Sequence, residues 1–107
     1  MNGQYKKGVF ELCILSLLEK KDCYGYDISE FLSRHMDISD GTVYPILRKL
    51  KTSGLVTTYL SEQSGGPPRK YYQITKLGKE QYAKDKEEWL SFIQTVCEIL
   101  EEGKEDE

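Results

Sequence analysis

Apolar residues recur at helical spacing in three stretches of the first half of the chain. In residues 5–19 they lie on almost every side of the predicted helix, so other elements of the chain or a second subunit must cover it, and both alternatives stay open. The second stretch has one apolar face, formed by Tyr24, Ile28, Phe31 and Leu32. The third has another, formed by Val43, Ile46, Leu47 and Leu50. Two amphipathic helices separated by a short linker predict a helix-turn-helix.

The ends of the third helix carry local signals. Ser39 and Asp40 are both favourable N-cap residues, and Gly54 follows the last apolar position as a C′ glycine would. Pro45 lies about one turn inside the helix and has no backbone donor, so we expect an irregular first turn.

Two stretches after Gly54 are rich in β-branched and aromatic residues. Residues 55–61 and 69–75 are predicted strands, and the segment between them contains two glycines and two prolines. Its length predicts a hairpin with a projecting tip rather than a two-residue turn. Three helices followed by a hairpin are the element order of a winged helix.

A long final helix is predicted for residues 76–102, with Thr75 as its N-cap. It would span about 40 Å at ~1.5 Å per residue. Its second half carries an apolar stripe that is longer than the rest of so small a domain can cover, formed by Trp89, Phe92, Ile93, Val96, Ile99 and Leu100. Residues 103–107 are predicted to be an acidic, solvated tail. The predicted fold class is therefore mainly α with a small β-hairpin.

The net charge of −3 conceals an uneven distribution of charged residues. Residues 1–79 contain twelve Lys and Arg against eight Asp and Glu, whereas the last 28 residues contain three against ten. Residues 41–79 are the most basic part, with seven basic residues and Glu62 as the single acid. A basic third helix and hairpin beside an acidic last helix indicate one side suited to DNA, although charge alone does not distinguish this from an ordinary solvated surface.

The outward face of the third helix mixes hydroxyl, aromatic and basic side chains, which suit a DNA groove. The candidates on and before this helix are Ser39, Thr42, Tyr44, Pro45, Arg48, Lys49 and Lys51. Arg48 can pair with a guanine edge, and Tyr44 and Pro45 can contact a thymine methyl or a sugar, while the hydroxyls can hold phosphate. In the hairpin, Arg69 and Lys70 can reach a flanking backbone or minor groove.

Catalytic, metal and membrane functions have little support in the sequence. His35 is the only histidine, no residue stands at a spacing typical of an activated nucleophile, and no Gly-rich phosphate loop precedes a helix. We therefore expect no enzyme activity, no cofactor and no metal site. Three isolated cysteines, Cys13, Cys23 and Cys97, predict reduced thiols and a cytoplasmic protein, and no apolar run approaches the ~20 residues that a bilayer requires.

Several motifs together match one family in the same order. They are residues 7–18 (KGVFELCILSLL), 24–28 (YGYDI), 40–50 (DGTVYPILRKL), 54–56 (GLV) and 66–75 (GPPRKYYQIT), followed by Gly78. The combination of Gly-Thr-x-Tyr-Pro-x-Leu with Pro-Arg-Lys-Tyr-Tyr is specific, whereas neither half alone would be. The chain resembles the PadR family of winged-helix transcriptional regulators, in the short type whose C-terminal part is one helix.

The resemblance implies a homodimer that binds a two-fold operator in double-stranded DNA, usually as a repressor. Residues 1–75 would be the DNA-binding winged helix, residues 76–102 the dimerisation helix, helped by the first helix, and residues 103–107 the acidic tail. The implied dimer or effector-binding residues are Phe10, Ile14, Trp89, Phe92, Ile93, Val96 and Leu100.

Two further alternatives concern the use of these surfaces. Some family members respond to aromatic compounds near the dimer interface, and Trp89 with Phe92 could either line such a site or pack in the interface. A winged-helix dimer that binds a protein partner and not DNA is the alternative from a different functional class.

Overall fold

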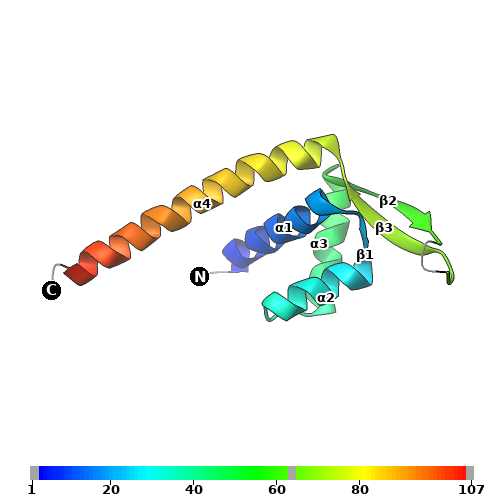
Figure 1. Cartoon of the computed structure of the whole chain (residues 1–107), viewed down its shortest axis with the longest axis horizontal. Coiled ribbons are helices and arrows are strands. Elements are labelled where there is room, and N and C mark those ends of the chain that lie inside the picture. The colour runs from blue at the N-terminus through cyan, green and yellow to red at the C-terminus, as the bar shows by residue number, and fades with distance from the viewer. Residues whose placement is uncertain (1–2, 63–64, 106–107) are drawn as a thin grey trace.

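The computed structural model describes the backbone of residues 3–62 and 65–105, whose elements are shown in Figure 1. They are α1 (Gly3–Lys20), β1 (Cys23–Tyr24), α2 (Gly25–His35), α3 (Asp40–Thr52), β2 (Val56–Ser61), β3 (Arg69–Ile74) and α4 (Lys76–Glu105). The predicted class, mainly α with a small β-hairpin, is confirmed. The hairpin of β2 and β3 projects at one end of the molecule, and α4 runs away from it above α1 (Figure 1).

The hydrophobic core surrounds α1, which contacts α2, α3, α4 and β3. Ile14, Leu15 and Leu18 are at most 2 % exposed and pack with the buried face of α3. The chain's own elements therefore cover this part of α1. The expected role of Ile14 in a dimer or effector surface needs correction, because its side chain has no exposed area and belongs to the core of the single chain.

The start of α3 is set by Ser39, which is the N-cap in an extended conformation. Its carbonyl accepts hydrogen bonds from the amides of Thr42 and Val43, at 3.0 and 3.1 Å. The helix is continuous from Asp40 through Pro45 to Thr52, and a carbonyl shared in this way is common at helix ends, so the expected irregular first turn stays a prediction. Asp40, the other expected N-cap, is already the first helical residue.

The end of α3 is a Schellman motif. Gly54 has a φ of 79°, which only glycine adopts at little cost. The Leu55 amide donates to the Leu50 carbonyl at 2.9 Å, and the Gly54 amide donates to the Lys51 carbonyl at 3.0 Å. The predicted C′ glycine is confirmed, and the chain turns here directly into β2.

The three strands form an antiparallel sheet in the order β1-β3-β2. The sequence predicted β2 and β3 but not β1, which is only two residues long and pairs Cys23 with Tyr72 and Tyr24 with Tyr71. Because paired residues point to one side of a sheet, Cys23 and Tyr72 share the inner face, where both are buried. The short strand joins the beginning of α2 to the wing.

The first turn of α4 is fixed to the base of the wing through Thr75. Its Oγ1 accepts a hydrogen bond from the Gly78 amide at 3.0 Å, which confirms the predicted N-cap, and donates to the Gly54 carbonyl at 2.7 Å. Its amide donates to the Leu55 carbonyl at 3.0 Å. Gly78 is buried at this joint. The position needs glycine, because a Cβ would overlap the Leu55 carbonyl oxygen and lie 2.8 Å from Ile74 Cγ1.

Beyond this joint, α4 extends well past the winged helix (Figure 1), and the molecule measures 61 Å along its longest axis against 27 and 21 Å. It continues to Glu105, three residues past the predicted end, so the expected tail is helical that far, and residues 106–107 lie outside the described residues. Apolar side chains on this part are 39–68 % exposed, namely Leu90, Phe92, Ile93, Ile99 and Leu100. None of the described helices is long and apolar enough to cross a membrane.

Substitution Gly78→Ala tests the joint between α4 and the wing. Because the new methyl group meets a backbone carbonyl that cannot rotate away, we expect the free energy of unfolding in urea to fall by about 2–3 kcal/mol. Gly8→Ala is the matched control: nothing lies within 4 Å of the added Cβ, so stability should stay the same or rise by up to about 1 kcal/mol. Equal stabilities of Gly78→Ala and the wild type would contradict the close approach.

Candidate nucleic-acid interface

The exposed face of α3 carries most of the residues that the sequence singled out for DNA. Val43, Ile46, Leu47 and Leu50 point into the core. The exposed candidates are Ser39, Thr42, Tyr44, Pro45, Arg48, Lys49 and Lys51. Hydrophobic periodicity therefore separated the two faces of this helix correctly.

Lys49 differs from its neighbours because it has an ionic partner within the chain. Its Nζ lies 2.8 Å from Glu11 Oε1 of α1, and the two side chains are 56 % and 23 % exposed. An exposed pair of this kind contributes at most about 1 kcal/mol to stability. The pair nevertheless offsets the charge of Lys49 and directs its side chain toward α1.

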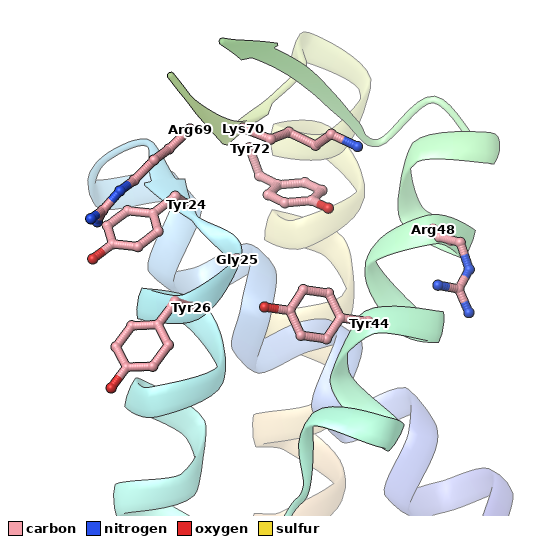
Figure 2. Close-up of a pocket in the computed structure, with 8 residues that line it drawn as sticks. All are labelled: Tyr24, Gly25, Tyr26, Tyr44, Arg48, Arg69, Lys70 and Tyr72. Carbon is pink, nitrogen blue, oxygen red and sulfur yellow. The ribbon is translucent and has the colours of Figure 1, made fainter. Parts of the chain in front are cut away.

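Four of the expected DNA-binding residues line one cleft between α2, α3 and the wing (Figure 2). They are Tyr44 and Arg48 of α3 and Arg69 and Lys70 of β3. The cleft has a volume of about 800 Å³, and none of the residues that line it is acidic. Residues that lie more than twenty positions apart in the sequence thus form one basic surface.

Tyr24, Gly25 and Tyr26 also line this cleft, and the sequence did not assign them a role there. Gly25 is buried and packs against the ring of Tyr44. A Cβ at this position would lie 2.9 Å from Tyr44 Cε1, so a larger residue would displace the ring. Figure 2 shows the Tyr44 hydroxyl directed toward Gly25 at the start of α2. The available signal was a glycine between two tyrosines at the start of the second amphipathic stretch.

A second contact holds α2 against α3. Ser29 is 6 % exposed, and its Oγ donates a hydrogen bond to Asp40 Oδ1. The Asp40 side chain, expected as an alternative N-cap, therefore bonds to α2 instead. This bond and the Gly25–Tyr44 contact fix the position of α3 relative to α2.

A row of tyrosines crosses the outer face of the wing. The ring of Tyr71 stacks on Tyr59, with centroids 5.6 Å apart, and meets the edge of Tyr24 at 5.7 Å. The Tyr59 hydroxyl donates to Asp22 Oδ2 at 2.6 Å, and this hydrogen bond is the main reason that the pKa of Tyr59 is raised to about 12. Gln73 Nε2 also donates to this oxygen at 3.2 Å. The row thus ends on a fixed carboxylate near β1.

Arg69 lies over the last ring of this row. Its Cζ is 4.7 Å from the centroid of Tyr24, a cation–π arrangement. Partial burial and a hydrogen bond to Asp27 raise the pKa of Tyr24, and Arg69 opposes this shift. Both Tyr24 and Tyr59 are therefore neutral near pH 7 and add no negative charge to the basic surface.

A separate groove of about 430 Å³ lies between α1 and α4. Trp89 and Phe92 line it, with ring centroids 6.0 Å apart and planes tilted by 40°. Leu12 and Leu15 of α1 form the opposite wall. Of the other expected dimer residues, Phe10 packs against the core, and three lie further along α4, namely Ile93, Val96 and Leu100.

The thiols do not form a reactive or metal-binding site within the described residues. Burial raises the pKa of Cys13 and is the main cause of the raised pKa of Cys23, so both stay protonated near neutral pH. All three cysteines are free. No group of three or more His, Cys, Asp or Glu side chains in the described ranges could hold a metal ion.

Comparisons with known proteins point to a single family. The model of the transcriptional regulator PadR-like family matches residues 14–84. A crystal structure of a PadR-like transcriptional regulator from Bacillus cereus superposes with a TM-score of 0.84 at 38 % identity, covering 92 % of this chain and 97 % of that chain.

Two curated relatives match most of this chain. An uncharacterised protein of Lysinibacillus sphaericus is 32 % identical over 103 residues, which are 92 % of this chain and 94 % of that protein. The negative transcriptional regulator PadR of Bacillus subtilis is 29 % identical over 98 residues. That match covers 88 % of this chain but 52 % of the Bacillus subtilis protein, so this chain spans about half the length of that relative.

Proposed function

Since the chain belongs to the PadR-like family of transcriptional regulators, we propose that it is a homodimeric repressor that binds duplex DNA sequence-specifically. Members of this family are transcriptional regulators and not enzymes. Repression is supported by the Bacillus subtilis relative, whose name describes it as a negative transcriptional regulator.

The basic cleft is the single observation that carries DNA binding. Arg48 of α3 and Arg69 and Lys70 of the wing line one cleft, whose lining residues are drawn in Figure 2. Arg48 also belongs to the exposed face of α3. An α-helix fits the major groove of B-DNA, where arginine can bind the O6 and N7 atoms of guanine. In this docking, Arg48 reads bases, and Thr42, Lys51 and the two wing cations hold phosphates.

The apolar stripe of α4 supports the dimer. Ile93, Ile99 and Leu100 lie 39–68 % exposed on a helix that extends beyond the domain, which is unusual for a stable monomer in water. A second copy that places the same stripe against this one would bury both, as two-fold symmetric interfaces do. Two copies of α3 would then meet successive major grooves, with half-sites about 10 base pairs apart.

Arginine and lysine substitutions test the docking. Arg48→Ala should weaken binding to the DNA upstream of its own gene about 10- to 100-fold and change the base preference. Arg69→Ala with Lys70→Ala should weaken binding to all sequences and reduce the slope of log K against log salt by about 2, because two phosphate contacts are lost. Fluorescence anisotropy at several salt concentrations measures both effects.

The control for this test is Lys84→Ala, which removes one positive charge, as Arg48→Ala does, but from the exposed surface of α4. It should leave affinity and salt dependence unchanged. Wild-type affinity in both variants would refute the docking. A wild-type protein with no salt-sensitive affinity for this DNA would favour the alternative, a winged-helix dimer that binds a protein partner.

A small aromatic effector that relieves repression is supported by the groove between α1 and α4, where Trp89 and Phe92 present adjacent rings. Because Trp89 is the only tryptophan, its emission reports on this groove alone. We expect at least one member of a panel of phenols, aromatic acids and aromatic amines to quench the emission and release DNA at the same concentration. No response across the panel would leave the two rings with a packing role only.

A further inference from the structure

The cleft between α2, α3 and the wing is lined by further residues that have no role in the proposed docking. Its wall on the α2 side consists of Tyr24, Gly25 and Tyr26, which precede or begin that helix. Tyr26 is 62 % exposed, and its ring stacks on Tyr24 with centroids 6.3 Å apart. Two phenol rings thus line the same cleft as the two cations of the wing, and Figure 2 shows Arg69 beside Tyr24 and Lys70 directed toward α3.

The size of the cleft indicates an extended ligand. A volume of about 800 Å³ far exceeds the space of one phosphate ion and lies within the range of sites for drug-sized molecules, ~300–1,000 Å³. The lining supplies Arg48, Arg69 and Lys70 for negative charge and tyrosine hydroxyls as hydrogen-bond donors. Arginine, lysine and tyrosine are among the side chains that proteins use to hold the DNA backbone.

The position of Arg69 within the cleft depends on the tyrosine row. Its guanidinium lies over Tyr24, which meets Tyr71, which stacks on Tyr59, and the Tyr59 hydroxyl bonds to Asp22. A side chain in a projecting hairpin would otherwise sample many rotamers at a cost in binding entropy. A guanidinium that lies flat on a ring still presents its N–H edges to an acceptor in the plane.

We propose that this cleft binds the sugar–phosphate backbone of DNA beside the groove that α3 enters, an inference that rests on the proposed function. Tyr26 contacts the DNA strand, and Tyr24 is a positioning residue for Arg69. The backbone of duplex DNA is the occupant, because Arg48 belongs both to the cleft and to the face of α3 that enters the groove. The α2 side of the winged helix thus joins the interface.

A double-mutant cycle measures the coupling between Tyr24 and Arg69. The variants are Tyr24→Phe, Tyr24→Leu, Arg69→Ala and the double variant Tyr24→Leu with Arg69→Ala, titrated with the duplex upstream of the gene. We expect Arg69→Ala and Tyr24→Leu each to weaken binding about tenfold, and the double variant to bind no more weakly than either single variant. Tyr24→Phe keeps the ring and should stay within about twofold of the wild type. Additive losses, or wild-type affinity in Tyr24→Leu, would overturn the positioning role.

Tyr26→Phe tests the contact with the strand without risk to the fold, because this side chain is largely exposed. We expect the variant to bind about threefold more weakly, and a duplex with one neutral methylphosphonate at the contacted position to bind wild type and variant alike. The matched control is Tyr82→Phe, which loses a hydroxyl that bonds to Ser16 Oγ at 3.3 Å far from the cleft. Equal affinities of Tyr26→Phe and the wild type for the unmodified duplex would overturn the contact.

A small phosphate ester would present the same phosphate group to the cleft as the DNA backbone does. Thymidine monophosphate is the probe that distinguishes the two ligands. Binding of this nucleotide that is lost in Arg69→Ala, together with unchanged duplex affinity in the tyrosine variants, would assign the cleft to a small ligand and overturn the proposal. Failure of the proposed function has a different signature, since the wild type itself would then not bind the duplex.

Discussion

A single joint connects the winged helix to the long helix α4. The Schellman end of α3, the residue before β2 (Leu55) and the first turn of α4 meet around Thr75, whose side chain bonds to the Gly54 carbonyl and caps α4. Gly78 lets the backbone of α4 approach the Leu55 carbonyl more closely than any side chain would allow. The direction of α4 is therefore tied to the end of α3, and any partner held by α4 would have a defined position relative to α3 and the wing.

The two ends of this arrangement have opposite electrostatic character. Residues 1–79 have an excess of four basic residues, and the last 28 residues an excess of seven acids, so the net charge of −3 says little about either surface. Phosphates would meet only the face that carries the cleft, which is lined by cations and tyrosines and by no acidic residue. Tyrosine is uncharged at neutral pH at its ordinary pKa of ~10, and the raised pKa values of Tyr24 and Tyr59 only extend that range upward. The acidic α4 lies on the side away from the wing tip (Figure 1), where it does not oppose this attraction at physiological salt.

Features that depend on neighbouring residues could be predicted from the sequence, and those that depend on distant residues could not. Gly54 and Thr75 signal the ends of α3 and α4 because capping is local. The strand β1 has two residues and exists only through its pairing with β3, which lies about fifty positions away. The Lys49–Glu11 pair spans 38 positions, so helical periodicity showed that Lys49 is exposed but not what it contacts. The burial of Ile14 likewise follows from four elements that pack around α1, and Tyr24 and Tyr26 enter the cleft only because β1 brings them beside the wing.

The stoichiometry of the protein–DNA complex tests most directly whether α4 joins two chains in one DNA-binding unit. Sedimentation velocity with a labelled duplex from the upstream region should give two chains per duplex. Ile93→Glu, which places a charge in the apolar stripe of α4, should yield a monomer in solution with greatly reduced affinity. Leu60→Glu, at an apolar position of the wing that is more exposed (70 % against 39 %), should remain a dimer. One chain per duplex at full affinity, or an Ile93→Glu variant that still binds as a dimer, would contradict the arrangement.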